Sequence, residues 1–531
     1  MSSRSQKSFR KCCKNKIFLV SFIMFVLVLA MFFAKVTTAL SQESSFRLQN
    51  VGFVRQYTYI MRVSGSNYQM IAGNTGNILF QSGSSSRVFN YIVGNCSTGD
   101  SIYVEQGFYY VDSMWNIKVN NLTVIFQRGA ILRAVNNLNS VLIFVNYVNG
   151  TTISGVEIDG NAVNQNSGLW GNYPYQASGI GVTGFGNLII DCIIYNCRVF
   201  GVFVTSWGGN CGVVNCTVYN CGANAIQLNG VANYAIGNTC WGCSDVGIAV
   251  FGPRAFIANN YIYDINGSTG FVNSHVGITV ESSGYATITN NTIKNCYYGI
   301  ATMNTVPPNS HSNYIAYNEI LNVNQGTGVS LGDDGHNVAT HNYINGSFAR
   351  GIEVNCYGNI VSFNRIIGVT TDQGAISLNS ASNNSISNNT ITLSTSGFGI
   401  WLLINNNQNI IQGNNIQAEI GIVIQNPNCN YNKLCGNILV NCTVQISDSG
   451  TGTIINPDTS AYYSLVFCNT YDGSGEGVYV YANNTSCTIT LNEGSILNVN
   501  GVNVYLEDNQ YILDMMKDYF VYVTRGFAII S

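Results

Sequence analysis

The chain has 531 residues, of which 9% are charged and 46% are hydrophobic, and its formal net charge is −3. An average soluble domain carries roughly 25% charged residues, so this protein is poor in charge, yet its hydrophobic content excludes a disordered polymer. From residue 40 onward, 15 basic residues stand against 25 acidic ones, a net charge of −10. That excess would repel phosphate backbones, so we expect no nucleic-acid partner.

The first 39 residues have the pattern of an export signal. A basic flank precedes Ile17–Phe33, a segment without charged residues, and small residues at Thr37 and Ala39 would permit cleavage. The segment is short for a bilayer span and long for a signal-peptide core. Two alternatives therefore stay open, a cleaved signal peptide and a membrane anchor through residues 17–34. Both place the rest of the chain outside the cytoplasm, secreted or on a cell or virion surface.

An internal repeat occupies the middle of the chain. Segments such as IANNYI (257–262) and ISNNTI (386–391) share one pattern, with an apolar residue, two variable residues, Asn, a variable residue and a second apolar residue. Cys192 and Cys216 take the place of Asn in the earliest copies. A period of 20 to 50 residues indicates a solenoid. The repeated Asn positions are Asn238, Asn260, Asn291, Asn318, Asn342, Asn364, Asn389, Asn414 and Asn437.

A second, Gly-led element follows each Asn by several residues. Its alternating β-branched pattern predicts short strands, and if each repeat is one coil, equivalent strands form parallel sheets about 4.8 Å apart. A stacked Asn side chain can bond its neighbours in adjacent coils and can adopt a left-handed corner. Leucine-rich repeats have a similar period, but Leu is sparse here. The Gly-led segments are GVFV (201–204), GIAV (247–250), GITV (277–280), GVSL (328–331), GIEV (351–354), GIWL (399–402) and GIVI (421–424).

With these repeats, and with GDSIYVEQGFYYV (99–111) and ISGVEIDGN (153–161), the chain resembles the right-handed parallel β-helices of the pectin-lyase-like superfamily. The resemblance covers residues 93–452 and implies a right-handed parallel β-helix solenoid. Together with the N-terminal membrane segment and the strand-like runs after residue 453, we expect an all-β fold with a β-rich C-terminal cap. We expect four parts: residues 1–39, the basic flank plus signal or anchor; 40–92, an N-terminal cap; 93–452, the parallel β-helix; and 453–531, a β-rich C-terminal cap or small domain ending in a helix near 509–519.

The cysteines and the glycosylation motifs follow the same repeat. Cys192 and Cys216 form one column and Cys197, Cys221 and Cys243 another, so either disulfides between coils or a buried stack of thiols would fit. Asn-x-Ser/Thr motifs are no more frequent than the Asn content produces by chance, and they mark sites where glycosylation could occur. These sites are Asn95, Asn121, Asn149, Asn215, Asn266, Asn290, Asn345, Asn383, Asn388, Asn441, Asn483 and Asn484.

Charged residues gather on two consecutive Gly-led strands. Asp333 and Asp334 follow one strand, Glu353 lies on the next, and Arg350 and His336 flank them. Three nearby carboxylates could share a proton, bind Ca²⁺, or act as acid and base on a glycosidic bond, with Arg350 contacting a uronate or acting as a lyase base. The alternative is a polar turn beside an Arg350–Glu353 ion pair on a solvated face.

Further candidates for glycan contact lie earlier in the chain. Glu281 is expected on the same outer column two coils before this cluster. Glu157, Asp159 and Asn161 form an Asp-Gly turn that could carry chemistry or merely round a corner. An insertion offers aromatic rings that could stack on sugars or pack as a cap. These are Trp170, Tyr173 and Tyr175.

The enzyme motifs of the resembling family are mostly missing. Polygalacturonases carry an Asn-Thr-Asp segment, an Asp pair, a Gly-His-Gly segment and an Arg-Ile-Lys segment, and only an Asp pair is present here. Two hypotheses follow: a surface protein with a structural or glycan-binding role on a cell or virus particle, or an extracellular polysaccharide lyase or glycoside hydrolase. The expected partners are a glycan or surface-layer component and further copies of the chain. No metal site is expected from motifs, although Ca²⁺ could join the carboxylates.

Overall fold

The computed structural model describes residues 57–166, 176–267, 274–281, 283–303, 311–323, 326–332, 334–346, 349–368, 373–393 and 397–456, and the backbone of six short strands between 478 and 530. The expected membrane segment and the expected helix near 509–519 lie outside these residues. Within them, no helix combines the length and the apolar character that a membrane span needs.

An N-terminal meander and one helix precede the repeats. β1 (Tyr59–Ser64), β2 (Asn67–Ala72) and β3 (Ile78–Ser82) pair antiparallel. α2 (Ser85–Asn95) begins at Ser84, whose side chain accepts a hydrogen bond from the Arg87 amide at 3.1 Å and so satisfies a free N–H of the first turn. Its buried Phe89 stacks on Trp115 at 4.1 Å. The helix therefore covers the apolar end of the first coil.

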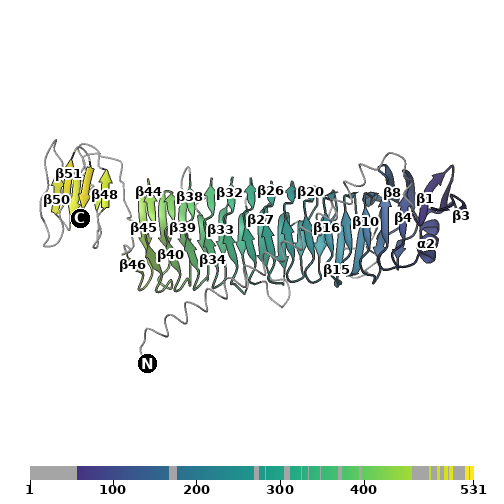
Figure 1. The fold of residues 1–531 in the computed structure, drawn as a ribbon. Coiled ribbons are helices and arrows are strands. Elements are labelled where there is room, and N and C mark those ends of the chain that lie inside the picture. Colours follow the sequence, from purple (N-terminus) through teal and green to yellow (C-terminus); the bar gives the residue numbers. More distant parts are fainter. Residues whose placement is uncertain are drawn as a thin grey trace, which may run out of the picture. The chain divides into compact units, whose positions relative to one another are not determined.

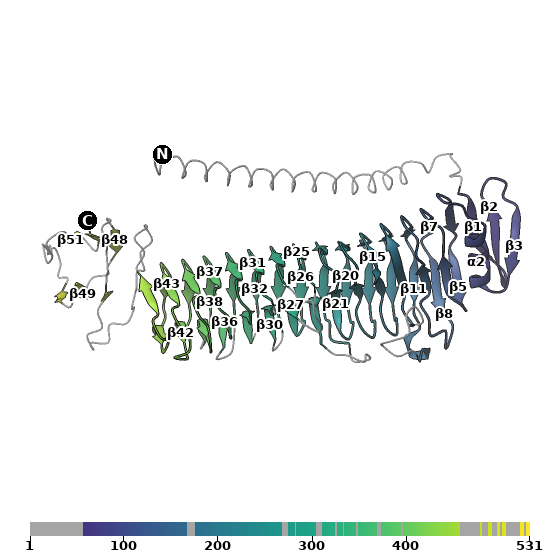
Figure 2. The ribbon, with the colours of Figure 1, turned by 90° about the horizontal axis from the view of Figure 1, so that it is seen from below.

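The repeats form successive coils of three strands each, and Figures 1 and 2 show the coils stacked from β4 to β46. In the first sheet, β1 pairs parallel with β4, and every later strand pairs parallel with its equivalent in the next coil. From β10 to β43 these strands have three residues, and the middle one is buried. The parallel strands are β4 (Ser101–Val104), β7 (Thr123–Phe126), β10 (Thr152–Ser154), β13 (Leu188–Ile190), β16 (Gly212–Val214), β19 (Tyr234–Ile236), β22 (Phe256–Ala258), β25 (Thr287–Thr289), β28 (Tyr314–Ala316), β31 (Val338–Thr340), β34 (Ile360–Ser362), β37 (Ser385–Ser387), β40 (Ile410–Gln412), β43 (Lys433–Cys435) and β46 (Ile454–Asn456).

The second sheet has 14 parallel strands in coil order. Its middle residues also point into the core, because side chains alternate between the two faces of a strand. The strands are β5 (Gly107–Val111), β8 (Ala130–Ala134), β11 (Glu157–Asp159), β14 (Ile193–Tyr195), β17 (Thr217–Tyr219), β20 (Thr239–Trp241), β23 (Tyr261–Tyr263), β26 (Thr292–Lys294), β29 (Glu319–Leu321), β32 (Tyr343–Asn345), β35 (Arg365–Ile367), β38 (Thr390–Thr392), β41 (Asn415–Gln417) and β44 (Ile438–Val440).

The third sheet also has 14 parallel strands and contains all the Gly-led segments that the repeat predicted. The Gly is required at Gly277, where a Cβ would lie 2.6 Å from the Gly299 carbonyl oxygen of the next coil. The strands are β6 (Trp115–Ile117), β9 (Ile143–Val145), β12 (Ile180–Phe185), β15 (Val202–Gly209), β18 (Ile226–Leu228), β21 (Val246–Val250), β24 (Val276–Glu281), β27 (Tyr298–Met303), β30 (Thr327–Leu331), β33 (Arg350–Val354), β36 (Gly374–Leu378), β39 (Phe398–Leu402), β42 (Ile420–Ile424) and β45 (Val444–Asp448).

Beyond the solenoid, the C-terminal part contains two small three-stranded sheets. One consists of β47 (Val478–Tyr479), β49 (Ile496–Val499) and β50 (Val502–Tyr505), and the other of β48 (Cys487–Thr490), β51 (Val521–Thr524) and β52 (Phe527–Ile530). The chain after residue 456 is therefore β-structured wherever it is described.

The predicted Asn column is a hydrogen-bonded ladder at the corner between the first and second sheets. The side-chain amide of Asn364 donates to Asn389 Oδ1 at 3.0 Å and to the Ala339 carbonyl at 2.8 Å. Its own Oδ1 accepts from the Asn342 backbone N–H and from Asn342 Nδ2, both at 3.0 Å. Similar bonds connect the ladder from Asn238 to Asn437. The prediction that these side chains bond between coils is confirmed.

The prediction about the corner backbone is wrong by one residue. The ladder Asn residues do not have positive φ; the residue immediately before each of them does, as at Tyr317 (φ 59°), His341 (55°) and Phe363 (56°). The reversal of the chain occurs at this preceding residue, whose side chain points out, so that the Asn side chain can point into the core. The outward rings of these three residues stack at 4.9 and 5.0 Å.

A second Asn ladder, which the sequence analysis missed, lies at the corner between the third and first sheets. Nδ2 of Asn384 donates to Asn409 Oδ1 at 3.0 Å, and that of Asn409 donates to Asn432 Oδ1 at 3.0 Å. Each member stands five residues before a member of the first ladder, so the repeat carries two Asn positions that bracket each strand of the first sheet. The members are Asn313, Asn337, Asn359, Asn384, Asn409 and Asn432.

All cysteines with described side chains are free thiols, and most are buried. Of the two alternatives for the cysteine columns, the structure therefore shows the thiol stack. Burial raises the pKa of Cys240 well above the ordinary value for a thiol, which keeps the thiol neutral in the core. The columns act as small apolar fillers where the core is narrow.

The three connections within a coil differ in how much their length varies. From β10 onward, two residues join each strand of the first sheet to the next strand of the second sheet. The connection from the second to the third sheet ranges from two residues, between β41 and β42, to 20, between β11 and β12. Length variation is thus absent at the corner that carries the first Asn ladder and large at the corner that leads into the third sheet.

Candidate functional site

The predicted charged cluster is only partly assembled on the third sheet. Arg350 and Glu353 form an ion pair on β33, and their side chains are 26% and 14% exposed. His336 is exposed at the next corner, with φ +57°, and its ring packs edge-on against Tyr357 at 5.1 Å. Asp334 is half-buried, and Asp333 lies outside the described residues. A shared role for these residues, including Ca²⁺ binding, stays a prediction.

The other predicted glycan-contacting residues are spread along the chain. The register aligns Glu281 with Met303 and aligns Glu353 with Ser330, so the two carboxylates occupy neighbouring columns of the sheet rather than one. Thr279 donates a hydrogen bond to Glu281 at 3.0 Å. The aromatic residues of the insertion lie outside the described residues, namely Trp170, Tyr173 and Tyr175.

The Asp-Gly turn is a structural corner. Arg133 pairs with Asp159 at 3.4 Å, and Asp159 accepts the backbone N–H of Asn161 at 3.0 Å. Glu157 accepts a hydrogen bond from the Tyr195 hydroxyl at 3.1 Å. Asp159 and Glu157 therefore bond to neighbouring strands of the second sheet and to the start of the long connection after β11.

Glycosylation motifs are accessible where they are described. Among the ten motifs with described side chains, nine have exposed Asn residues, and Asn345 is half-buried. Asn483 and Asn484 lie outside the part whose side chains are described. Several of the exposed residues occupy left-handed corners, as Asn290 and Asn388 do. Glycosylation itself stays a prediction.

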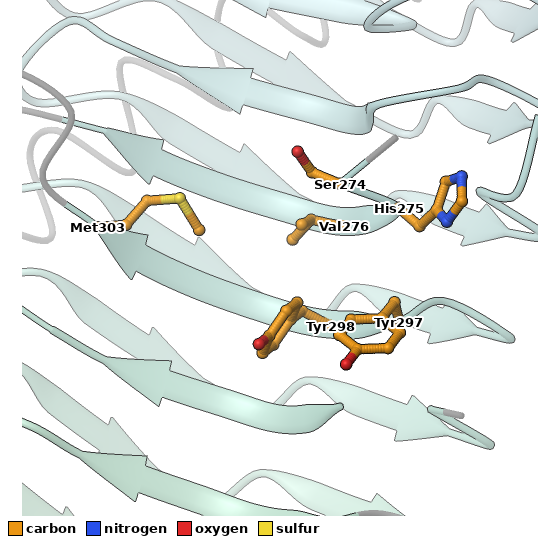
Figure 3. Close-up of a pocket in the computed structure, with 6 residues that line it drawn as sticks. All are labelled: Ser274, His275, Val276, Tyr297, Tyr298 and Met303. Carbon is orange, nitrogen blue, oxygen red and sulfur yellow. The ribbon is translucent and has the colours of Figure 1, made fainter. Parts of the chain in front are cut away.

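The outer face of the third sheet is hollowed between β24 and β27 (Figure 3). The hollow has a volume of about 480 Å³ and is lined by two strands and the residues that lead into them. Val276 also belongs to a small buried apolar cluster with Ala249 and Ala301, against which Tyr298 and Met303 pack. Figure 3 shows Met303 at the far end of β27 from Tyr298. The lining residues are Ser274, His275, Val276, Tyr297, Tyr298 and Met303.

Asp245 and His275 stand immediately before consecutive strands, β21 and β24, and His275 is one of the residues that line the hollow. Backbone bonds fix them, because the Val276 N–H donates to the Asp245 carbonyl at 3.0 Å and the Tyr297 N–H donates to the His275 carbonyl at 2.8 Å. Burial raises the pKa of the Asp245 carboxyl, and hydrogen bonds from Ser274 and the charge of His275 oppose that shift. Asp245 Oδ1 and His275 Nε2 are both buried and have no hydrogen-bond partner among the described residues.

The hollow and the Arg350–Glu353 pair belong to the same face. Burial raises the pKa of the Tyr298 hydroxyl, the negative charges of Tyr297 and Glu353 raise it further, and the Arg350 guanidinium lowers it. The charges of Arg350 and Glu353, which lie two coils after Tyr298, therefore both act on the Tyr298 hydroxyl. The face presents, in coil order, a buried carboxyl, an imidazole, two phenol rings and an ion pair.

The sequence analysis missed Asp245, His275, Tyr297 and Tyr298, although a signal was present. Each lies one or two residues before the Gly of a Gly-led segment, in DVG (245–247), HVG (275–277) and YYG (297–299). Aligning the repeats on that Gly places these residues in two adjacent columns, with Arg350 in the second. The analysis considered the residues within and after each strand and did not extend the alignment backward.

Comparisons with known proteins agree with this fold. A family model described as a right-handed β-helix region matches residues 141–314, and one described as a periplasmic copper-binding protein, NosD, matches residues 304–462. No curated protein matches the chain. The residues described here do not gather three or more His, Cys, Asp or Glu side chains around a possible metal position.

Several solved structures are similar to the chain at low identity. Bacteriophage phi29 gene product 12, in its pre-mature form, is 15% identical, with 72% of this chain and 56% of that chain covered and a TM-score of 0.48. The A-module of mannuronan C-5 epimerase AlgE6 from Azotobacter vinelandii is 14% identical, with 70% and 94% covered and a TM-score of 0.37. DFA-IIIase from Arthrobacter chlorophenolicus A6 without its lid is 14% identical, with 62% and 90% covered and a TM-score of 0.42.

Proposed function

We propose that this right-handed parallel β-helix protein acts outside the cytoplasm and binds a glycan along the outer face of its third sheet. The basic and apolar start of the sequence supports export, as does the periplasmic description of one matching family model. The binding surface is proposed from the geometry of that face. The glycan can come from two sources, a cell or particle surface or a free polysaccharide, because both present the same sugar units.

One observation carries the proposal, which is the hollow of about 480 Å³ beside Tyr297 and Tyr298. Its volume falls within the usual range for small-ligand sites, roughly 300 to 1,000 Å³. Tyr297 is 42% exposed, so part of its ring is accessible to the C–H face of a sugar. An aromatic ring with a polar tip at the edge of a hollow is suited to bind the amphipathic ring of a sugar.

Cleavage of the bound glycan is the second candidate function. Asp245 and His275 favour it, because a carboxyl group and an imidazole stand immediately before consecutive strands, and these are the side chains most used for acid–base catalysis. The Arg350–Glu353 pair is a less suitable centre because each charge already neutralises the other.

Binding of the purified full-length protein to an array of surface and matrix polysaccharides tests the proposal, and reducing-end release from the same polymers tests cleavage. Tyr298→Ala should weaken binding at least tenfold, because the variant loses one wall of the hollow. Tyr431→Ala is the control, since Tyr431 is 62% exposed and lies at a distant corner. Equal binding by the two variants would refute a site on the third sheet.

A further inference from the structure

We propose that the outer face of the first sheet is an interface between two copies of this chain, which pair face to face through it. The inference goes beyond the proposed function and is independent of it, because the hollow lies on the outer face of the third sheet. Pairing through the first sheet involves a different face of the coils, so self-association and glycan binding can be tested separately.

The outward side chains of the first sheet are almost free of charge. In the twelve strands from β10 to β43, the first and third residues alternate with the buried middle one and point outward. Lys433 is the one charged residue among these 24 positions, and none is acidic. The equivalent positions of the second sheet, from β11 to β44, carry five charged residues, namely Glu157, Asp159, Lys294, Glu319 and Arg365.

Apolar side chains on this face are exposed to solvent. Tyr314, Ile360 and Ile410 begin β28, β34 and β40, and they are 39%, 44% and 42% exposed. Tyr317 and Phe363 border the face at the corner toward the second sheet and are 53% and 52% exposed. Parallel sheets are normally covered on both faces, and contiguous exposed apolar surface marks an interaction site. We therefore expect another surface to cover this face.

The face is large enough for a stable dimer. Twelve strands about 4.8 Å apart extend over about 53 Å, and the five residues from one bracketing Asn to the other span about 16 Å. These dimensions give roughly 800 Å², which is about the area that each partner buries in a standard interface. The two-residue connections to the second sheet leave that edge of the face without long loops.

Charge and periodicity favour a second copy as the occupant. From residue 40 onward the chain has a net charge of −10, so two copies repel one another least across a face without acidic residues. A second copy also has the same coil spacing, so the rows of side chains from two such sheets can interdigitate along their whole length. A membrane surface is less suitable, because it attracts faces rich in Lys and Arg, and this face has Lys433 alone.

Sedimentation velocity of the full-length protein, in a detergent whose density the solvent matches, measures the oligomeric state. We expect the wild-type chain of 57.6 kDa to sediment as a dimer at micromolar concentration. Ile360→Lys brings a charge into the face of both copies and should raise the dissociation constant at least tenfold. Ile410→Lys repeats the test two coils further along. Ile193→Lys is the matched control, because Ile193 is 42% exposed at the first position of β14 in the second sheet, and it should leave the dimer unchanged.

Other results would overturn the inference. A monomeric wild-type protein does so, and so do dimers that persist in both Ile360→Lys and Ile410→Lys with native circular dichroism. An equal loss of dimer in Ile193→Lys would show that the face has no specific role. If the wild-type protein is monomeric and binds phosphatidylcholine vesicles more tightly than Ile360→Lys does, the face belongs to a membrane contact instead. The proposed function depends on the polysaccharide array and on Tyr298→Ala, so its failure is distinguishable from each of these results.

Discussion

At the scale of single residues, the buried Asn side chains show how this fold satisfies polar groups in a narrow core. Asn364 takes part in four hydrogen bonds through its side chain, two as donor and two as acceptor. Its amide reaches one coil forward and one coil back at the same time. No apolar side chain could replace it without leaving unpaired groups in both adjacent coils.

Substitution of one ladder residue should therefore cost more than its size suggests. Asn364→Ala leaves the Asn342 amide groups and the Ala339 carbonyl without their partner, and each buried unpaired group costs about 1–3 kcal/mol. We expect the free energy of unfolding to fall by about 2–4 kcal/mol, measured by urea denaturation followed by circular dichroism. Thr390→Ala changes an exposed strand position nearby and serves as the control. Its free energy of unfolding should fall by less than about 0.5 kcal/mol. Similar losses in the two variants would show that the ladder contributes little.

Individual residues also mark where prediction from sequence succeeded and where it stopped. The first ladder was predicted because its Asn recurs at a fixed place relative to apolar residues. The left-handed position was assigned one residue late, since Asn commonly occupies both kinds of position and the periodicity alone does not distinguish them. Asp245 and His275 were missed because the repeats were compared from their Gly onward, and each of these residues stands two positions before that Gly.

At the scale of elements, the outer face of the second sheet carries a stack of aromatic rings, whereas the outer face of the third sheet carries the hollow. Tyr195, Tyr219, Trp241 and Tyr263 follow in register, with centroid distances of 5.0, 4.3 and 5.5 Å and ring planes within 12° of parallel. Their faces are occupied by one another, so only ring edges are free. We interpret this stack as a stabilising feature and not as a sugar platform.

Removal of the Trp241 ring tests whether the stack stabilises the fold. Trp241→Ala abolishes two stacking contacts, each worth about 0.5–1.5 kcal/mol beyond burial of area, and we expect the free energy of unfolding to fall by about 2–3 kcal/mol. Trp207→Ala is the matched control, because Trp207 is 60% exposed on β15. Near-ultraviolet circular dichroism of both variants should change strongly for Trp241→Ala only. An equal loss of stability in both would contradict a specific role for the stack.

The sequence predicted most of the strands of the third sheet. The spacing of the repeats also predicted that each strand pairs with the equivalent strand of the next coil. The Gly-led segments became the third sheet because Gly, followed by alternating β-branched residues, permits close approach between coils. The three-residue strands of the first two sheets could be recognised only through repetition, since an isolated three-residue run carries no strand signal. The helix α2 was not predicted, because the sequence before residue 93 has no repeat with which to compare it.

At the scale of the whole molecule, the low charge content determines how stability varies with pH. Charged residues make up 9% of the chain and form ion pairs such as Arg133–Asp159 and Arg350–Glu353, so acidification can break few favourable contacts between charges. Thiols behave differently. Burial raises the pKa of the Cys296 thiol to about 12. Burial is also the main cause that raises the pKa of Cys240 and Cys243 well above the ordinary value of a thiol.

These thiol shifts predict a stability that is retained in acid and lost in alkali. An unfolded thiol ionises near pH 9, whereas the folded one holds its proton longer, so its stabilising effect is complete below about pH 9 and declines as the pH rises toward 12. Urea midpoints should be similar at pH 4 and pH 7 and should fall at pH 10.5. Loss of native circular dichroism at pH 4, or an unchanged midpoint at pH 10.5, would contradict this account.

The unequal connections between sheets have a consequence for how such a chain can diversify. Two residues separate the first and second sheets in every coil from β10 onward, whereas the approach to the third sheet varies from two residues to 20. Insertions are thus tolerated at the approach to the third sheet and not at the corner of the first Asn ladder. The outer face of the third sheet can therefore change one coil at a time while the first ladder stays constant, so homologues should differ most in the loops that lead into the third sheet and least at the first ladder.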